Sequence, residues 1–185
     1  EKNPKDFSLK NTEWGKFMCD MFDLWFDDFS HGKPAPVIRF IENAFHSHLG
    51  LTAPECTFKE TCGDYLVVEH NGDVYSCDFY VTEQQLLGNI HHARLIDMLH
   101  SDAQQEFGMK KNLQSRECYE CKWQSLCYGG CPKYRNNTTH QNHFCESYKM
   151  FFEYSNDRFQ WLKNQWLSNN PGFKGEVLDI SGYLQ

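Results

Sequence analysis

Cysteines dominate one short segment of the chain and limit what it can form. Four cysteines lie within the fourteen residues from Cys118 to Cys131, and Cys145 follows. Two adjacent glycines interrupt the segment just before Cys131, so it cannot be a regular helix or strand that merely contains sulfur. Thiolates at such short spacing are typical metal ligands. The segment therefore predicts a metal site.

The length and charge of the chain restrict its class and its partners. Its 185 residues suffice for one domain with a core, or for a core and a small satellite. A formal charge of −7 and a pI of about 5.7 argue against binding to nucleic acid or to an anionic membrane. No apolar run approaches the ~20 residues of a membrane span, and no signal-peptide pattern opens the sequence. We therefore expect no nucleic-acid or membrane partner and a cytoplasmic location.

The cysteine count favours metal or redox chemistry over disulfides. The chain has nine cysteines, and the cytosol keeps thiols reduced. For an exported protein, four disulfides and one free thiol would be the alternative. Cys19 lies alone on a predicted helix and is interpreted as a core residue. The other eight cysteines suffice for two sites of four thiolates each.

Apolar periodicity predicts helices on both sides of the cysteine-rich region. Large apolar residues recur at helical spacing over 12–29, over 37–49 before Gly50, and over 148–166. Two shorter helical pieces are expected at 92–99 and 103–110. The predicted fold class is α+β, with N-terminal helices, a small cysteine-rich β-hairpin domain that holds two metal clusters, and a C-terminal helix.

A β-hairpin is predicted in the middle of the chain. Asn71-Gly72 lies between β-forming residues, which is the strongest short-range signal for a hairpin. If these two residues form the turn, Leu66 pairs with Cys77.

Two consequences follow for the cysteines near this hairpin. The chain must curl at Gly63 to bring Cys62 back toward Cys77. Because Cys77 and Asp78 would be neighbours on a strand, their side chains should leave on opposite faces.

Spacing divides the eight cysteines into two sets of ligands. In two-cluster ferredoxins, a cysteine that precedes proline and is separated from its predecessor by three residues ligates the other cluster. Cys131 matches this pattern. Each set then takes three ligands from one local segment and one from further along. The first set is Cys56, Cys62, Cys77 and Cys131, and the second is Cys118, Cys121, Cys127 and Cys145.

Zinc and iron–sulfur clusters both accept four thiolates. Paired C-x2-C knuckles would indicate zinc, but the chain has only one, at Cys118 and Cys121. A [4Fe–4S] cluster with four thiolates is anionic, and the segment from Lys110 to Arg135 carries an excess of positive charge. This segment favours iron–sulfur clusters for electron transfer or structural support. A zinc-binding interaction module without redox chemistry is the alternative.

The complete pattern resembles that of a known family. It comprises C-x5-C-x14-C, the run from Cys77 to Tyr80, C-x2-C-x5-C-x3-C-P and a last cysteine, with Gly88-Asn89-Ile90 between them. It resembles the SPASM domain of the anaerobic sulfatase-maturating enzymes, which are radical S-adenosylmethionine (radical SAM) enzymes. The resemblance implies a SPASM domain at 54–146, a helical linker from the radical domain at 1–53, and a C-terminal helix and tail at 147–185.

The resemblance also implies a reaction, in which a sulfatase cysteine or serine becomes formylglycine. A radical made from S-adenosylmethionine at a further [4Fe–4S] cluster takes a hydrogen from Cβ. Asp78 matches the family's aspartate after the third cysteine and would remove the thiol or hydroxyl proton, while two [4Fe–4S] clusters accept or relay the electron. A carboxylate near anionic clusters should have a raised pKa, which suits a base. The alternative for Asp78 is an aspartate that makes only local hydrogen bonds.

The sequence departs from the family in one respect. It contains no C-x3-C-x2-C, the motif that binds the radical-generating cluster. We therefore expect an inactive fragment that lacks the radical SAM barrel core. Its expected partners are the missing N-terminal radical domain and a sulfatase polypeptide. Alternatives are a SPASM domain from another radical peptide-modifying enzyme and a standalone electron-transfer or scaffold protein.

Overall fold

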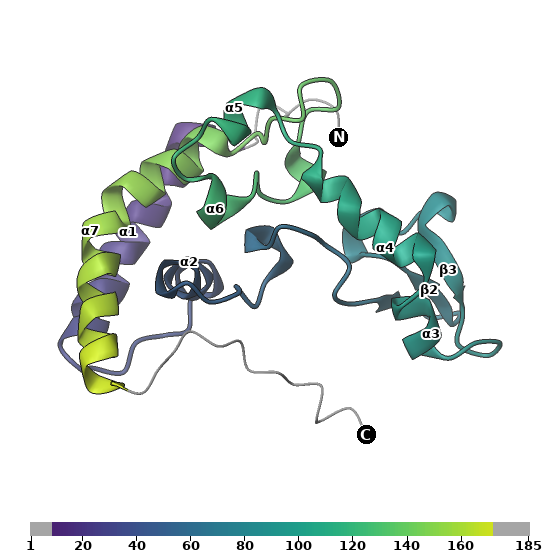
Figure 1. Cartoon of the computed structure of the whole chain (residues 1–185), viewed down its shortest axis with the longest axis horizontal. Coiled ribbons are helices and arrows are strands. Elements are labelled where there is room, and N and C mark those ends of the chain that lie inside the picture. Colours follow the sequence, from purple (N-terminus) through teal and green to yellow (C-terminus); the bar gives the residue numbers. More distant parts are fainter. Residues whose placement is uncertain (1–8, 172–185) are drawn as a thin grey trace.

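The computed structural model describes residues 9–171, which form an arch (Figure 1). The helices are α1 (Asn11–Ser30), α2 (Arg39–Leu49), α3 (Leu95–Leu99), α4 (Asp102–Met109), α5 (Arg116–Tyr119), α6 (Gln124–Cys127) and α7 (Cys145–Asn169). The strands are β1 (Val67–Val68), β2 (Asp73–Tyr75) and β3 (Leu86–Asn89). Short 3-10 helices are η1 (Cys56–Phe58), η2 (Asp78–Tyr80), η3 (Glu83–Gln85), η4 (Lys110–Asn112) and η5 (Pro132–Tyr134). The mixed helical and antiparallel architecture agrees with the predicted α+β class.

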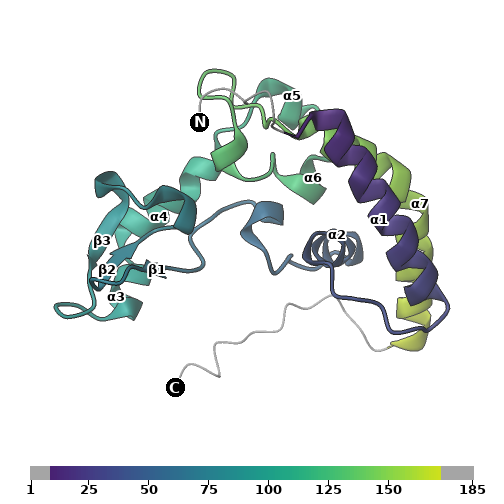
Figure 2. The same cartoon turned by 180° about the vertical axis from the view of Figure 1, so that it is seen from behind.

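Helices α1 and α7 form one side of the arch, and the sheet with α3 and α4 forms the other (Figures 1 and 2). Helix α2 lies on the inner side. The predicted helices are present, and most of their ends are shifted. Helix α2 ends where predicted, because Gly50 adopts a φ of 78° and caps it. The tail after residue 171 lies outside the described residues. Within residues 9–171, no helix combines the length and the apolar character needed to cross a membrane.

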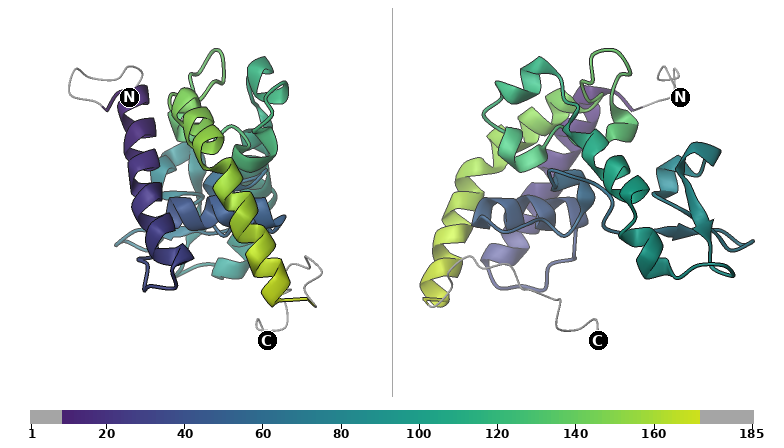
Figure 3. Two further views of the ribbon diagram at one scale, coloured as in Figure 1. Left: turned by 90° about the vertical axis from the view of Figure 1, so that its left-hand side faces the viewer. Right: turned by 45° about the vertical axis from the view of Figure 1, so that its right-hand side comes forward.

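Helices α1 and α7 run side by side in the same direction (Figure 3). They approach closely at Gly15, where an added Cβ would lie 3.0 Å from the Cα of Ser147. Further along, Asp23 accepts a hydrogen bond of 2.7 Å from the Tyr154 hydroxyl and forms an ion pair with Arg158. The pairing requires a small residue at one end and complementary charge at the other.

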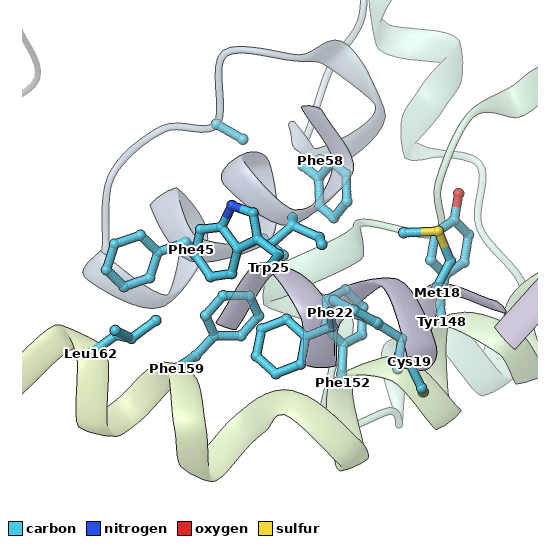
Figure 4. Close-up of a cluster of buried hydrophobic side chains, with 14 of the residues drawn as sticks. Met18, Cys19, Phe22, Trp25, Phe45, Phe58, Tyr148, Phe152, Phe159 and Leu162 are labelled. Atoms are coloured by element: carbon cyan, nitrogen blue, oxygen red, sulfur yellow. The ribbon is translucent and has the colours of Figure 1, made fainter. Parts of the chain in front are cut away.

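The hydrophobic core lies where α1, α2 and α7 meet (Figure 4). The ring of Phe159 on α7 is 4.8 Å from that of Phe22 on α1 and 5.8 Å from that of Phe45 on α2. Cys19 is buried in the same core, as predicted. The aromatic stripe of α1 therefore serves packing.

The sheet is an antiparallel meander in the order β1-β2-β3. Val67 pairs with Tyr75, so the predicted hairpin register is wrong by one residue. The loop has three residues because Gly72, at a φ of 86°, follows the turn in the left-handed conformation. The Asn71 side chain accepts a hydrogen bond of 3.1 Å from the Asp73 backbone and stabilises this turn.

Strand β3 is an element that the sequence pattern does not predict. Its short segment contains Gly88, which is unfavourable in strands, and lacks clear alternation. It is a strand because it pairs with β2, where Gly88 lies opposite Val74. Contact with β2 thus overrides a weak local preference.

Candidate functional site

A cavity of about 680 Å³ brings together cysteines from distant segments. Its lining includes residues from the loop after α2, the end of the hairpin, α4 and the start of η5. The four cysteines in this lining are Cys56, Cys62, Cys77 and Cys131. Cys131 belongs to the later cysteine segment, so the cavity joins both parts of the cysteine-rich region.

A second, much smaller cavity of about 20 Å³ lies at α5, α6 and the start of α7. It is lined by Cys118, Cys121, Cys127 and Cys145. All nine cysteines, including these eight, are free thiols within residues 9–171. The structure thus brings the cysteines together in the same two groups of four into which the spacing divides them.

Two kinds of metal group accept four thiolates, a zinc ion and an iron–sulfur cluster. A tetrahedral zinc ion with Zn–S bonds of about 2.3 Å needs sulfurs about 3.8 Å apart. In the part of the chain that is described, no three His, Cys, Asp or Glu side chains are arranged to hold a single metal ion. The same set of four thiolates also fits an iron–sulfur cluster, in which each iron takes its own thiolate.

Helix α4 positions the chain around Cys62 at the first cavity. The chain bends at Gly63, which has a φ of 96°, as the sequence predicts. The Cys62 backbone then donates a hydrogen bond of 3.2 Å to the Gly108 carbonyl on α4. The buried Gln104 side chain donates to the carbonyls of Gly63 and Tyr65, each at 3.1 Å. These contacts hold Cys62 and the start of the hairpin against the same helix.

One buried and one half-buried cation lie near the cysteines, Lys111 and Arg135. The Lys111 ammonium has no exposed surface and donates to three backbone carbonyls of the segment that begins at Cys56. Burial lowers the pKa of Lys111 to about 8. The Arg135 guanidinium donates to carbonyls on η4 and on the turn before Cys131.

Two other cations of the segment from Lys110 to Arg135 lie in ion pairs at the surface. The excess of positive charge in the sequence does not show this difference. Arg116 pairs with Glu120 and Lys122 pairs with Glu153, both at the surface. Only tertiary contacts distinguish Lys111 and Arg135 from these surface cations.

Asp78 lies at the first cavity, but its geometry corrects the prediction. Strand β2 ends at Tyr75 and η2 begins at Asp78, so Cys77 and Asp78 are not strand neighbours. The Cys77 thiol instead donates to Asp78 Oδ1 at 3.2 Å, and the Tyr65 hydroxyl donates to the same oxygen at 2.8 Å. The hydrogen bonds from Tyr65 and from the Cys77 thiol lower the pKa of Asp78 in the absence of a cluster. The rise expected beside a bound anionic cluster stays a prediction.

Tyr65 is a site residue that the sequence reasoning missed. Its hydroxyl lies 3.2 Å from the Cys77 sulfur as well as contacting Asp78. Continuing the observed register from Val67 opposite Tyr75 places Tyr65 opposite Cys77. A three-residue loop in the predicted hairpin would have revealed this neighbour.

Comparison with known proteins shows which proteins the chain is similar to. Residues 56–122 match the family model of SPASM, an iron-sulfur cluster-binding domain. The cysteine-type anaerobic sulfatase-maturating enzyme of Clostridium perfringens is 36% identical over 159 residues, which cover 84% of this chain and 43% of that enzyme. The chain carries a SPASM domain and is homologous to the anaerobic sulfatase-maturating enzymes. The serine-type enzyme of Bacteroides thetaiotaomicron is 34% identical over 166 residues, which cover 86% of this chain and 39% of that enzyme.

Solved structures share the fold of this SPASM domain and its flanking helices. Native anSMEcpe with bound AdoMet matches with a TM-score of 0.78 and 35% identity, over 89% of this chain and 46% of that chain. A structure of native anSMEcpe with bound AdoMet and Kp18Cys peptide gives the same values. The chain thus spans less than half the length of these relatives.

Proposed function

We propose that the chain is the auxiliary-cluster region of an anaerobic sulfatase-maturating enzyme. The observation that carries this proposal is the gathering of two groups of four cysteines at two cavities of one fold. Homology to cysteine-type and serine-type enzymes supports it. The region would assist the oxidation of a sulfatase cysteine or serine to formylglycine.

Each group of cysteines would hold one [4Fe–4S] cluster. The donor chemistry fits, because all eight side chains are free thiols and a cubane cluster takes one thiolate for each of its four irons. When bound, such a cluster supplies an acceptor for a single electron. The division into 1–53, 54–146 and 147–185 belongs to the same proposal, and the family match at 56–122 lies inside the middle segment.

Asp78 is the proposed base. Its carboxylate is exposed, lines the first cavity and accepts a hydrogen bond from the Tyr65 hydroxyl. An exposed aspartate is ionised at neutral pH and can therefore accept a proton. A substrate side chain that becomes an aldehyde or thioaldehyde loses one hydrogen atom from Cβ, one proton from oxygen or sulfur, and one electron. Asp78 would take the proton, while the hydrogen bond from Tyr65 holds the carboxylate in place. With a cysteine substrate, water must then replace the sulfur, which leaves as hydrogen sulfide.

The radical that takes the hydrogen atom would come from outside this chain. The sequence has no C-x3-C-x2-C, and it spans less than half the length of its relatives. We therefore include in the proposal a radical domain that binds S-adenosylmethionine and a third [4Fe–4S] cluster. That domain and this chain would act together on a sulfatase polypeptide, and the chain alone would be inactive.

Metal analysis tests the two-cluster proposal. After anaerobic purification and reconstitution, we expect about eight iron and eight sulfide per chain, because two cubane clusters require them. Cys62→Ala should lower the iron content of the first site, whereas Cys19→Ala should retain all the iron because Cys19 lies in the helical core. Stoichiometric zinc without sulfide would contradict the proposal and leave a zinc-binding module.

Gly108→Ala should damage the first site without removing a ligand. An added Cβ would lie 2.4 Å from the carbonyl oxygen of Cys62, so the backbone around Cys62 must move. We expect the loss of about half of the bound iron, the share of one of two cubanes.

The control for this variant is Glu106→Ala, because Glu106 is exposed on the same helix. Iron and sulfide measured per folded chain should match the unsubstituted protein in this control. A Gly108→Ala chain with full iron and sulfide would show that the contact with α4 does not position Cys62.

A further inference from the structure

Lys111 is a buried cation whose contacts differ from those of the surface cations. Its ammonium donates to the carbonyl of Thr57 at 3.1 Å and also to the carbonyls of Cys56 and Lys59. These three contacts fix the segment that carries the first cysteine of the first cavity. Because the side chain has no exposed surface, water does not screen its charge.

The charge of Lys111 lacks a carboxylate partner in the part of the chain that the structure describes, where its contacts are all to carbonyl oxygens. Lys59, in contrast, pairs with Asp64 near the surface. A buried cation is costly unless an opposite charge compensates it. The nearby titratable groups that can supply negative charge are the thiols of Cys62, Cys56 and Cys131, all in the lining of the first cavity.

Arg135 holds Lys111 in this place. Its guanidinium donates to the Lys111 carbonyl at 2.6 Å, to the Leu113 carbonyl at 2.7 Å and to the Tyr128 carbonyl at 2.9 Å. It also donates to the carbonyls of Gly129 and Gly130, just before Cys131. The backbone of η4 is thereby fixed to the turn that delivers the fourth cysteine.

We propose that Lys111 is the fixed counter-charge of the first four-cysteine site and raises the reduction potential of the cluster bound there. This inference rests on the proposed function. Reduction adds one electron to an already anionic group, and a nearby positive charge stabilises the reduced form more than the oxidised form. The effect is strong where the charge is buried, because the effective dielectric constant is low.

The test is a spectroscopic redox titration of the whole reconstituted chain under anaerobic conditions. The wave that Cys62→Ala removes or shifts identifies the first cluster, and the other wave is an internal reference. Lys111→Gln removes the charge but keeps an amide donor for the carbonyls, and Lys111→Met removes both. Lys111→Arg keeps the charge. Lys16→Met is the matched control, because it removes the same charge from an exposed position on α1.

In both neutral variants, we expect the ratio of reduced to oxidised first cluster at a fixed potential to fall at least about tenfold. For a one-electron couple, this corresponds to a downward shift of about 59 mV. Lys111→Arg and Lys16→Met should shift this wave much less. If the neutral variants bind the first cluster and its reduction potential is unchanged, the inference is overturned.

Two further outcomes separate charge from structure. If both neutral variants fail to load the first cluster while Lys111→Arg loads it, the need for the charge is supported. Failure of all three substitutions alike would assign Lys111 a structural role only and overturn the inference. If the unsubstituted chain takes up no iron and sulfide, the proposed function itself fails, and this result is distinct from all the others.

Discussion

Replacing Asp78 by asparagine in the full-length enzyme is expected to lower kcat by about 10²–10⁴-fold, the usual contribution of a general base or acid. Asparagine has nearly the same size, and its amide oxygen can still accept the hydrogen bond that Tyr65 donates at 2.8 Å. It cannot take a proton from the substrate. Formylglycine formed in a sulfatase peptide, followed by mass spectrometry, measures the effect, with KM determined separately.

The Asp78 variant should keep both clusters, because this carboxylate is not among the proposed ligands. Asp97→Asn is the control, since Asp97 is exposed on α3 and pairs with Arg94 at 2.7 Å. Its kcat and its iron content should be unchanged. If Asp78→Asn retained full turnover with both clusters loaded, Asp78 would not be the base, and its contacts with Tyr65 and Cys77 would be local hydrogen bonds only.

Phe159→Ala is expected to destabilise the chain by about 3–5 kcal/mol, the range for large-to-small changes at fully buried aromatic residues. Phe159 has no exposed surface, and its ring contacts those of Phe22 and Phe45 on two other helices. Truncation would leave a cavity where all three helices meet. Anaerobic urea denaturation, followed by circular dichroism, measures the free energy of unfolding.

Phe17→Ala is the matched control for this core substitution. Phe17 is 55% exposed on α1, so the same chemical change should alter the stability by less than about 1 kcal/mol. Equal losses in the two variants would contradict the assignment of Phe159 to the centre of the core. A small loss for Phe159→Ala would mean that neighbouring rings refill the space.

Periodicity in the sequence was sufficient to locate the long helices. An amphipathic helix must repeat its apolar residues every three or four positions, whatever it packs against. The stripe containing Phe22 therefore predicted α1, which spans Asn11–Ser30. It could not reveal that α7 runs parallel to α1, because direction depends on contacts such as that between Gly15 and Ser147.

The hairpin shows the limit of local signals. Asn71-Gly72 correctly indicated a turn, but the same pair fits both two-residue and three-residue loops. The three-residue loop moves the register by one residue relative to the two-residue loop and so changes the residue opposite Cys77. The sequence therefore missed the contact of Tyr65 with Cys77 and Asp78.

By itself, the sequence determined the helical and hairpin segments, the bend at Gly63 and the division of eight cysteines into two groups, whose role as ligands remains a prediction. These features depend on spacing and on local backbone preferences. The tertiary structure alone decided the pairing of β3, the contact of Cys77 with Asp78, and the burial of Lys111. Lys111 contacts a carbonyl 55 residues earlier in the chain. No local pattern encodes such a contact, because it forms only when distant segments pack together and exclude water.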